Sequence, residues 1–288
     1  MPETPSIPKQ LVECYQAIVE AYKAGANVTK LIAGFNTLLR ELKKTPISEV
    51  TSKALDLKKQ ALELASTAQT QTLINTVIGV IVATVIALLL FILYTRYRYR
   101  PWLLWLKLRG NQQVHSSQGR GKSMITSGEV WAVILAVIIV ASVFAVAQAI
   151  TAGRVVEPFS ELGLLGPKKK IGDYPKTVLV GDKIKLYIYI GNHMGHPTWY
   201  IVYAKLGNKT TFVNSTTPAN LPPIWKYQIL LNHNMYITKP VTLTMNKTGT
   251  NLKLIFELWY IDPETGKEKY YTWTHLYLNV TAPPTKLT

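Results

Sequence analysis

The sequence predicts a membrane-anchored protein of mixed class, with a helical bundle at one end and an all-β domain at the other. Two observations lead to this fold class. Two long runs of apolar residues without any charge lie in the middle of the chain, and the hydrophobic period changes from helical before them to alternating after them. With 48% hydrophobic residues among 288, the chain is also too apolar for a disordered protein.

Residues 1–72 are predicted to form an external helical bundle, because apolar residues recur there at helical spacing in three stretches. The stretches are marked by Leu11, Tyr15, Ile18 and Tyr22, by Leu31, Phe35, Leu38 and Leu42, and by Val50, Ala54, Leu57, Ala61, Leu64 and Ala68. We expect Gly25 to end the first helix, Asn27 to cap the second, and Pro46 to precede the third. The three apolar faces are expected to bury one another.

Residues 73–94 and 130–150 are predicted to be two transmembrane helices. Neither run contains a charged residue, and each has the length of about 20 residues that a bilayer core requires. The segment between them, residues 95–129, carries seven Lys and Arg residues, which predicts a cytoplasmic basic loop and puts both chain ends outside the cell. We expect the following residues to lie at the membrane interface: Arg96, Arg98, Arg100, Trp102, Trp105, Lys107 and Arg109.

Residues 151–176 are expected to be a juxtamembrane stalk, and residues 177–288 an external antiparallel β-sandwich of immunoglobulin type. Apolar and polar residues alternate there, with many β-branched and aromatic side chains. The predicted strands are 177–180, 183–190, 198–206, 210–214, 225–231, 236–245, 252–261 and 269–280. Because the only cysteine is Cys14, which we expect to be a packing residue, the core must depend on burial of Trp199, Trp225, Trp259 and Trp273.

Charge and sequons agree with an envelope protein. The net charge of +16 is spread over the loop and the strands rather than focused in one basic helix, so nucleic acid is not an expected partner. Five Asn-X-Ser/Thr triplets fall in the segments assigned to the outside, and they are candidate glycosylation sites: Asn27, Asn208, Asn214, Asn246 and Asn279.

Motifs for catalysis or metal binding are weak. The Ser116–Ser123 segment lacks the first glycine of a phosphate loop. His193 and His196 stand three residues apart without further ligands nearby in sequence, and neither Asp173 nor Glu161 has an evident acid–base partner. We therefore expect no catalytic residues, no metal and no cofactor. A cleft that gathered titratable groups around His193 or Asp173 would reopen the enzyme hypothesis.

Several short motifs resemble a known family. They are Glu157–Gly166, Asp173-Tyr-Pro175, Val180-Gly181 and Gly191-Asn192-His193, directly after a predicted span. This pattern is similar to the archaeal integral-membrane family catalogued as domain of unknown function 1616. The resemblance covers roughly residues 75–280 and implies paired spans followed by an external immunoglobulin-like domain. It implies an archaeal envelope protein but no activity.

The sequence favours a non-enzymatic accessory or scaffold protein of the archaeal cell membrane. Its expected partners are the lipid bilayer and other envelope proteins, with the N-glycosylation (oligosaccharyltransferase) or protein secretion machinery as candidate complexes by analogy of fold. The alternative is a surface-layer anchor or carbohydrate-binding envelope protein, in which aromatic rings on one solvent-facing sheet bind glycans.

Overall fold

The computed structural model describes residues 7–42, 44–97, 144 and 157–282. The N-terminal part of these residues contains three helices. They are α1 (Lys9–Lys23), α2 (Thr29–Glu41) and α3 (Ile47–Tyr97). Gly25 follows α1 with a φ of +89°, a conformation that favours glycine, and Asn27 Oδ1 accepts a hydrogen bond of 3.1 Å from the Thr29 amide at the start of α2. The three predicted helices are confirmed, with Gly25 after α1 and Pro46 before α3, but the N-cap position of α2 is held by Val28 and not by Asn27.

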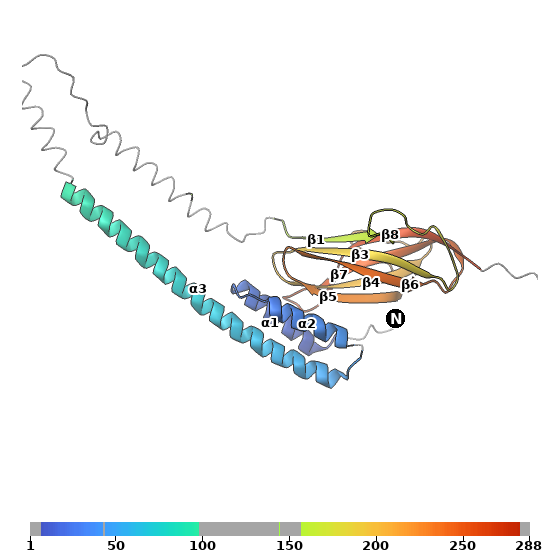
Figure 1. The fold of residues 1–288 in the computed structure, drawn as a ribbon, viewed down its shortest axis with the longest axis horizontal. Coiled ribbons are helices and arrows are strands. Elements are labelled where there is room, and N and C mark those ends of the chain that lie inside the picture. Colours follow the sequence, from blue (N-terminus) through green and yellow to red (C-terminus); the bar gives the residue numbers. More distant parts are fainter. Residues whose placement is uncertain (1–6, 43, 98–143, 145–156, 283–288) are drawn as a thin grey trace, which may run out of the picture. The chain divides into compact units, whose positions relative to one another are not determined.

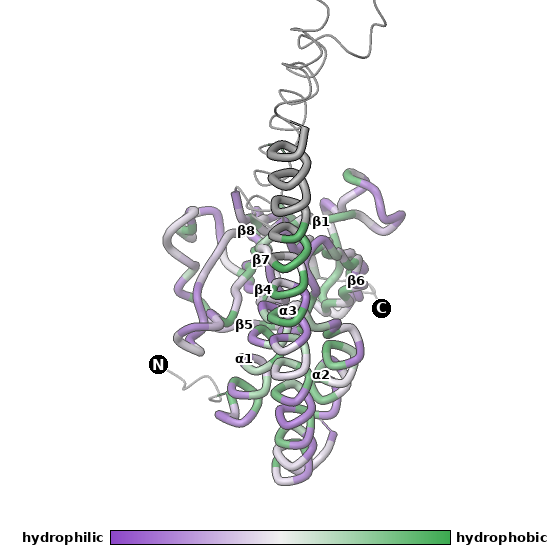
Figure 2. Tube along the Cα trace, turned by 90° about the vertical axis from the view of Figure 1, so that its left-hand side faces the viewer, coloured by the Kyte–Doolittle hydropathy of each residue, from purple (hydrophilic) through white to green (hydrophobic). Residues whose placement is uncertain are grey.

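The two predicted transmembrane helices can be compared with the structure only in part. Within the part of the chain that the structure describes, no helix is identified as both long and apolar enough to cross a bilayer. The first predicted span, 73–94, falls inside α3, where Figure 2 shows a change from mixed to hydrophobic colouring. The second predicted span, except for Phe144, and residues 98–129 lie outside the described residues.

Eight strands make two sheets in the C-terminal region. A three-stranded sheet has the order β1-β3-β6, and a five-stranded sheet has the order β2-β8-β7-β4-β5. Their bounds are Phe159–Leu165 (β1), Thr177–Leu179 (β2), Lys183–His193 (β3), Thr198–Gly207 (β4), Pro223–Leu231 (β5), Met235–Thr244 (β6), Gly249–Ile261 (β7) and Glu268–Thr281 (β8). The pairs are antiparallel except β2 with β8, which are parallel, so the wholly antiparallel prediction is corrected at this edge.

Two predictions about the limits of the β domain were wrong. The expected stalk, 151–176, contains strand β1, whose inward residues Leu162 and Leu164 join the core between the sheets. Residues 210–214 were expected to form a strand but lie in a loop. The side chains of Asn208 and Asn214 bind backbone amides of that loop and so replace the hydrogen bonds of a sheet.

The N-terminal helices do not form the separate bundle that the sequence suggested. Residues 1–72 and 155–288 belong to one compact unit, in which α1 and α2 lie against the outer face of the five-stranded sheet (Figure 1). Trp199 is fully buried there, with ring centroids 6.0 Å from Tyr15 and 5.1 Å from Phe35. Helices and sheet therefore share one hydrophobic core, which we call the helix–sheet core.

Hydrogen bonds fix the helices on the sheet. Tyr15 donates to the Pro197 carbonyl at 3.3 Å, and Gln16 donates to the Pro263 carbonyl at 3.0 Å. Asn36 forms a reciprocal pair with Leu230 of the edge strand β5, since its Nδ2 donates to the carbonyl and its Oδ1 accepts from the amide, both at 2.8 Å. This pair satisfies backbone groups that an edge strand otherwise leaves open.

A second core fills the space between the two sheets, with residues such as Leu186, Val202 and Phe256. The prediction that four tryptophans carry the domain needs correction. Only Trp199 is fully buried, and it lies in the helix–sheet core; Trp225, Trp259 and Trp273 are half-buried. Aliphatic residues and Tyr200 do most of the packing between the sheets.

Candidate functional site

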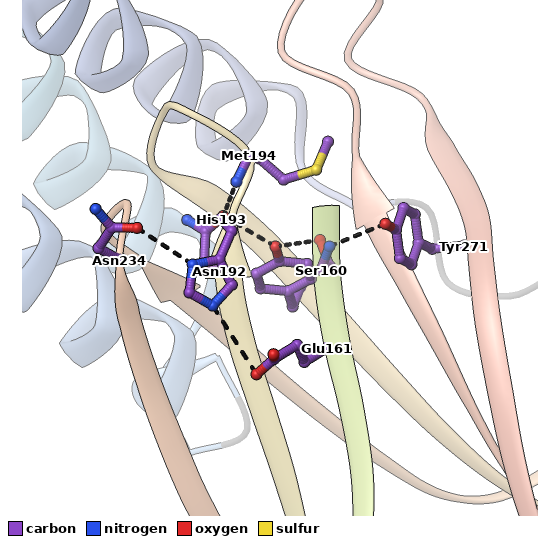
Figure 3. Close-up of polar contacts among 8 residues, drawn as sticks. Ser160, Glu161, Asn192, His193, Met194, Asn234 and Tyr271 are labelled. Atoms are coloured by element: carbon purple, nitrogen blue, oxygen red, sulfur yellow. Dashed lines mark hydrogen bonds and ion pairs between the residues drawn. The ribbon is translucent and has the colours of Figure 1, made fainter. Parts of the chain in front are cut away.

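The motif residues around Asn192 form a buried polar network (Figure 3). The Asn192 amide donates to the carbonyls of His196 and Leu231 at 2.9 Å each. Its oxygen accepts from the Met194 amide at 3.0 Å and from the Tyr200 hydroxyl at 3.1 Å. Both donors and both acceptor positions of this amide are used, so Asn192 ties the β3–β4 turn to β5.

Ser160 extends this network to strand β1. Its hydroxyl lies 2.6 Å from the Tyr200 hydroxyl, and its amide donates to the Tyr271 hydroxyl at 2.9 Å. Burial raises the pKa of Tyr200 well above its usual range, so this phenol stays protonated. The Ser160 hydroxyl is thus held by a phenol and not by a base, an arrangement that joins strands but does not activate a nucleophile.

His193 and Glu161 lie together on the outer face of the three-stranded sheet. His193 Nε2 is 3.9 Å from a Glu161 oxygen, His193 Nδ1 is 3.2 Å from Asn234 Oδ1, and the imidazole stacks on Phe159 at 4.5 Å between ring centroids. Burial and the nearby Glu161 carboxylate raise the pKa of Tyr189. Glu161 and His193 are partly exposed, so this is an open acidic and aromatic surface rather than a cleft.

The histidines of the neighbouring turns each have a structural contact. His196 Nδ1 lies 2.9 Å from the Pro197 carbonyl, and His233 Nδ1 accepts from the Gly195 amide at 3.1 Å. Burial, then the proximity of His193 and His196, lowers the pKa of His233. Within residues 7–42, 44–97, 144 and 157–282, no group of three or more His, Cys, Asp or Glu side chains is placed to hold a metal ion.

Asp173 lies at a cavity on the edge of the sandwich. The cavity has a volume of about 570 Å³, and it is lined by Leu164, Asp173, Tyr174, Lys176, Thr274, His275, Leu276 and Tyr277. Tyr174 donates to the Leu164 carbonyl at 2.7 Å, which closes the β1–β2 loop on β1. The cavity gathers Asp173, Lys176 and His275, the condition set above for reopening the enzyme hypothesis, although Asp173 is already paired with Lys168 at 3.1 Å. The sequence pointed to Asp173 alone. It gave no signal that residues about one hundred positions later would lie beside it.

A buried ion pair lies on the outer side of the five-stranded sheet. Lys205 Nζ is 2.8 Å from a Glu257 oxygen, and the Glu257 side chain is fully buried. Glu257 also accepts from the Ala219 amide at 2.6 Å and from Trp259 Nε1 at 3.0 Å. The charges are thus satisfied by the β4–β5 loop and β7, and the pair holds that loop against the sheet.

The remaining site predictions divide by location. Asn27, Asn208 and Asn246 are exposed, whereas Asn214 and Asn279 are half-buried. Arg96 is in the last turns of α3, and the other predicted interface residues, Arg98 to Arg109, lie outside the described residues. Cys14 is fully buried in the helix–sheet core, and burial raises its pKa to about 12, as a packing residue requires.

Comparisons with solved structures give distant likenesses. A β-glucosidase of Listeria innocua matches with 11% identity and a TM-score of 0.27, over 43% of this chain and 16% of that one. The CARDB domain of a Pyrococcus furiosus protein, solved with di-metal ions, matches with 11% identity and a TM-score of 0.28, over 43% and 89%. A chain of the complex between Zinc 2-glycoprotein and prolactin inducible protein from human seminal plasma matches with 12% identity and a TM-score of 0.28, over 44% of this chain and 98% of that one.

Comparisons of sequence give a family for the β domain. A search of curated proteins found no match. Residues 154–281 match the family model of the domain of unknown function DUF1616. The sequence motifs led us to expect a resemblance from about residue 75, but the match begins at residue 154. It covers the sandwich and not the predicted spans. The C-terminal part of this chain is thus a DUF1616 domain.

Proposed function

We propose that the chain is a non-enzymatic integral membrane scaffold of the archaeal cell envelope, with its helices and immunoglobulin-like sandwich on the outer side. There it would hold partner proteins as an accessory subunit. The N-glycosylation machinery, whose catalytic enzyme is the oligosaccharyltransferase, and the protein secretion machinery are the candidate complexes.

The observation that carries this proposal is the helix–sheet core. Tyr15 and Phe35 come before the uncharged runs, and Trp199 comes after them, yet the three rings touch. Two segments that share a core must lie on the same side of any membrane. If the chain between residues 72 and 157 enters a bilayer, it must cross it an even number of times, which agrees with the proposed hairpin of two spans and opposes a single span.

The character of α3 supports attachment to lipid. Seven large apolar side chains are between 47% and 61% exposed, and they are Leu73, Ile74, Val77, Ile78, Ile81, Val82 and Val85. Exposed apolar surface of this kind marks a site of contact with protein or membrane. The basic character of residues 95–129 then favours a cytoplasmic position for that segment and an external one for both ends.

Two polar clusters, around Asn192 and at the Lys205–Glu257 pair, are saturated by structural contacts, which supports a scaffold. In the described residues, Asn192, Ser160 and the Lys205–Glu257 pair all use their polar atoms to join strands and loops. An enzyme would instead aim such groups at a site for a reacting molecule. The rigid unit of helices and sheets offers a fixed surface for partners.

Labelling of engineered cysteines tests the topology. In a Cys14→Ala background, a membrane-impermeant maleimide should label Lys30→Cys and Asn246→Cys on intact cells, and Ser116→Cys only after permeabilisation. The reverse pattern would invert the molecule and remove the envelope role. Labelling of positions 30 and 246 from opposite sides would contradict the shared core itself.

Copurification tests the scaffold role. The chain, extracted in mild detergent with a tag after residue 282, should bring the same membrane partners in repeated preparations. A matched variant, Tyr236→Glu, changes an aromatic residue that is 67% exposed and should reduce partner recovery if the open sheet is the docking face. A protein that is always recovered alone would contradict the proposal.

The carbohydrate-binding alternative keeps one supporting observation. Trp199, Trp225 and Trp259 belong to the cores or pack against them, so they do not offer a platform for sugars. Trp273 also packs against a small core cluster, but on β8 it is followed by the rings of His275 and Tyr277, and Tyr277 is 46% exposed. These rings give the alternative a definite location.

A further inference from the structure

We infer that the cavity at the edge of the sandwich, between the β1–β2 loop and β8, is a binding site for a neutral saccharide. This goes beyond the scaffold role and does not depend on the membrane placement. It gives the carbohydrate-binding alternative a site whose lining contains none of the four tryptophans of the β domain.

The wall of the cavity is preformed by a tightly closed loop. A side chain at Gly166 would place its Cβ 2.1 Å from the Gly172 carbonyl oxygen, so only glycine allows the two ends of the loop to meet. The Gly166 amide also donates to the Lys170 carbonyl at 2.8 Å. Gly172 and Asp173 follow with φ angles of +115° and +53°, which turn the chain so that Asp173 comes to line the cavity.

Two aromatic rings of β8, those of His275 and Tyr277, line one side of the site, and Trp273 lies next to them outside the lining. Trp273, His275 and Tyr277 alternate along β8 and so lie on one face of the strand. Trp273 stacks on His275 at 4.8 Å, and His275 meets Tyr277 edge-on at 5.0 Å. Tyr277 is 46% exposed, so its ring has a free surface against which the apolar C–H face of a sugar ring can pack.

Polar groups of both kinds complete the lining. Asp173 offers carboxylate oxygens as acceptors, Lys176 offers ammonium donors, and the Thr274 hydroxyl can do both. Asp173 forms an ion pair with Lys168 at 3.1 Å, and Lys176 adds one positive charge to the lining. The hydroxyl groups of a saccharide can donate to the carboxylate and accept from the ammonium groups. Burial, then the charge of Lys253, lowers the pKa of His275, so the imidazole is neutral and can accept or donate.

The volume fits this ligand class. Small-molecule sites usually enclose roughly 300–1,000 Å³ and combine an apolar lining with a few polar groups. A cavity of about 570 Å³ lies within that range and is large enough for one or two sugar rings. The exposed rings of Phe159 and Tyr236 do not belong to the lining of this cavity, which makes Tyr236 a matched control.

Calorimetric titration of the full chain with maltose, cellobiose and N,N′-diacetylchitobiose tests the inference. The protein should be kept in lauryldimethylamine oxide, because detergents with sugar headgroups would compete for the site. At least one disaccharide should bind with a Kd of roughly 0.1–10 mM. Tyr277→Ala should weaken that binding by about tenfold, equivalent to about 1.4 kcal/mol.

Three further variants separate recognition from folding. Tyr277→Phe keeps the ring and should bind within about twofold of the wild type, whereas Asp173→Ala should lose about tenfold. Tyr236→Ala should leave binding unchanged. The inference is overturned if the folded protein binds none of the three sugars, or if Tyr236→Ala weakens binding as much as Tyr277→Ala. The topology and copurification experiments are read separately, so failure here leaves the scaffold proposal intact.

Discussion

The outer faces of the two sheets differ in whether helices cover them. On the five-stranded sheet, α1 and α2 cover Trp199, Ile201 and Tyr203, which are at most 6% exposed. On the three-stranded sheet, no helix covers the corresponding face among the described residues, and β3 presents Lys183 and Lys185 to solvent. One sheet is thus buried on both sides near its centre, and the other on one side only.

The strand sequences reflect this difference. Strand β4 is buried continuously from Thr198 to Lys205, whereas the first part of β3 alternates between exposed and buried residues. A continuous apolar strand is typical of a sheet with both faces covered, and alternation is typical of a sheet with one face in water. The composition of β4 therefore indicates a cover, and α1 and α2 supply it.

The largest expected effect concerns the covered face. Trp199→Ala should reduce the free energy of unfolding by about 3–5 kcal/mol, because it removes a large ring and leaves a cavity between helix and sheet. Tyr236→Ala on the open face should change it by about 0.5 kcal/mol or less. Urea unfolding of the full chain, followed by circular dichroism, measures both. Equal effects would mean that the helices do not depend on this contact.

The buried ion pair on the covered sheet comes next. Lys205→Met leaves the Glu257 carboxylate, which is fully buried, without its counter-ion, and should cost about 3 kcal/mol. The double variant with Glu257→Gln should cost less than the sum of the two single changes. As a control, Lys168→Met breaks the exposed pair with Asp173 and should cost about 1 kcal/mol or less. Additive effects at Lys205 and Glu257 would argue against the pair.

A smaller effect is expected at the edge of the covered sheet. Asn36→Ala removes both hydrogen bonds to Leu230 and should cost about 1–2 kcal/mol. Thr37→Ala, at the next position of α2, changes an exposed side chain that binds only its own helix at 3.1 Å, and should be nearly neutral. Urea unfolding followed by circular dichroism measures the free energy of unfolding of both variants. If both variants behave alike, Asn36 does not fasten α2 to β5.

The smallest effect is a dependence on pH at the β7–β8 turn, which contacts α1. The hydrogen bond from Lys269 is the main reason that the pKa of Asp262 falls from its ordinary value of 3.8 to about 2. Because the folded-state pKa is the lower one, this stabilisation is present above pH 3.8 and is lost as the pH falls toward 2. Stability should therefore decline across this window.

The matched variant isolates that carboxylate. Asp262→Asn should show a weaker decline in unfolding free energy between about pH 4 and pH 2.5 than the wild type. Glu268, whose pKa is raised by burial, acts in the opposite direction and above its ordinary value of 4.5, outside this window. Identical pH dependence of the unfolding free energy in both proteins would show that Asp262 does not cause the decline.

Much of the secondary structure could be predicted, and the exceptions have local causes. Periodicity located α1, α2 and most of the long strands to within a few residues. It missed β1, in which only Leu164 is buried and Gly163 interrupts the pattern. It also placed a strand at 210–214, since Thr211 and Val213 are β-branched, although Asn208 and Asn214 turn the chain there.

Less of the candidate site could be predicted. Asp173 was considered as a lone acidic residue, and Trp273 as a core residue. Asp173 lies beside His275 and Tyr277 because the β1–β2 loop passes beside β8 (Figure 1). A pairing between strands distant in sequence leaves no mark at either position, so His275 and Tyr277 could not be recognised as partners of this loop.

The sequence by itself determined the places of α1, α2 and most of the long strands, which of their faces are apolar, and that two uncharged runs separate the helices from the sandwich. Only the tertiary structure decided that the first 72 residues and the sandwich share a core. The physical reason is that burial of apolar surface is not directional. An apolar stripe on α1 or α2 requires a cover, but it is satisfied equally by another helix or by the outer face of β4.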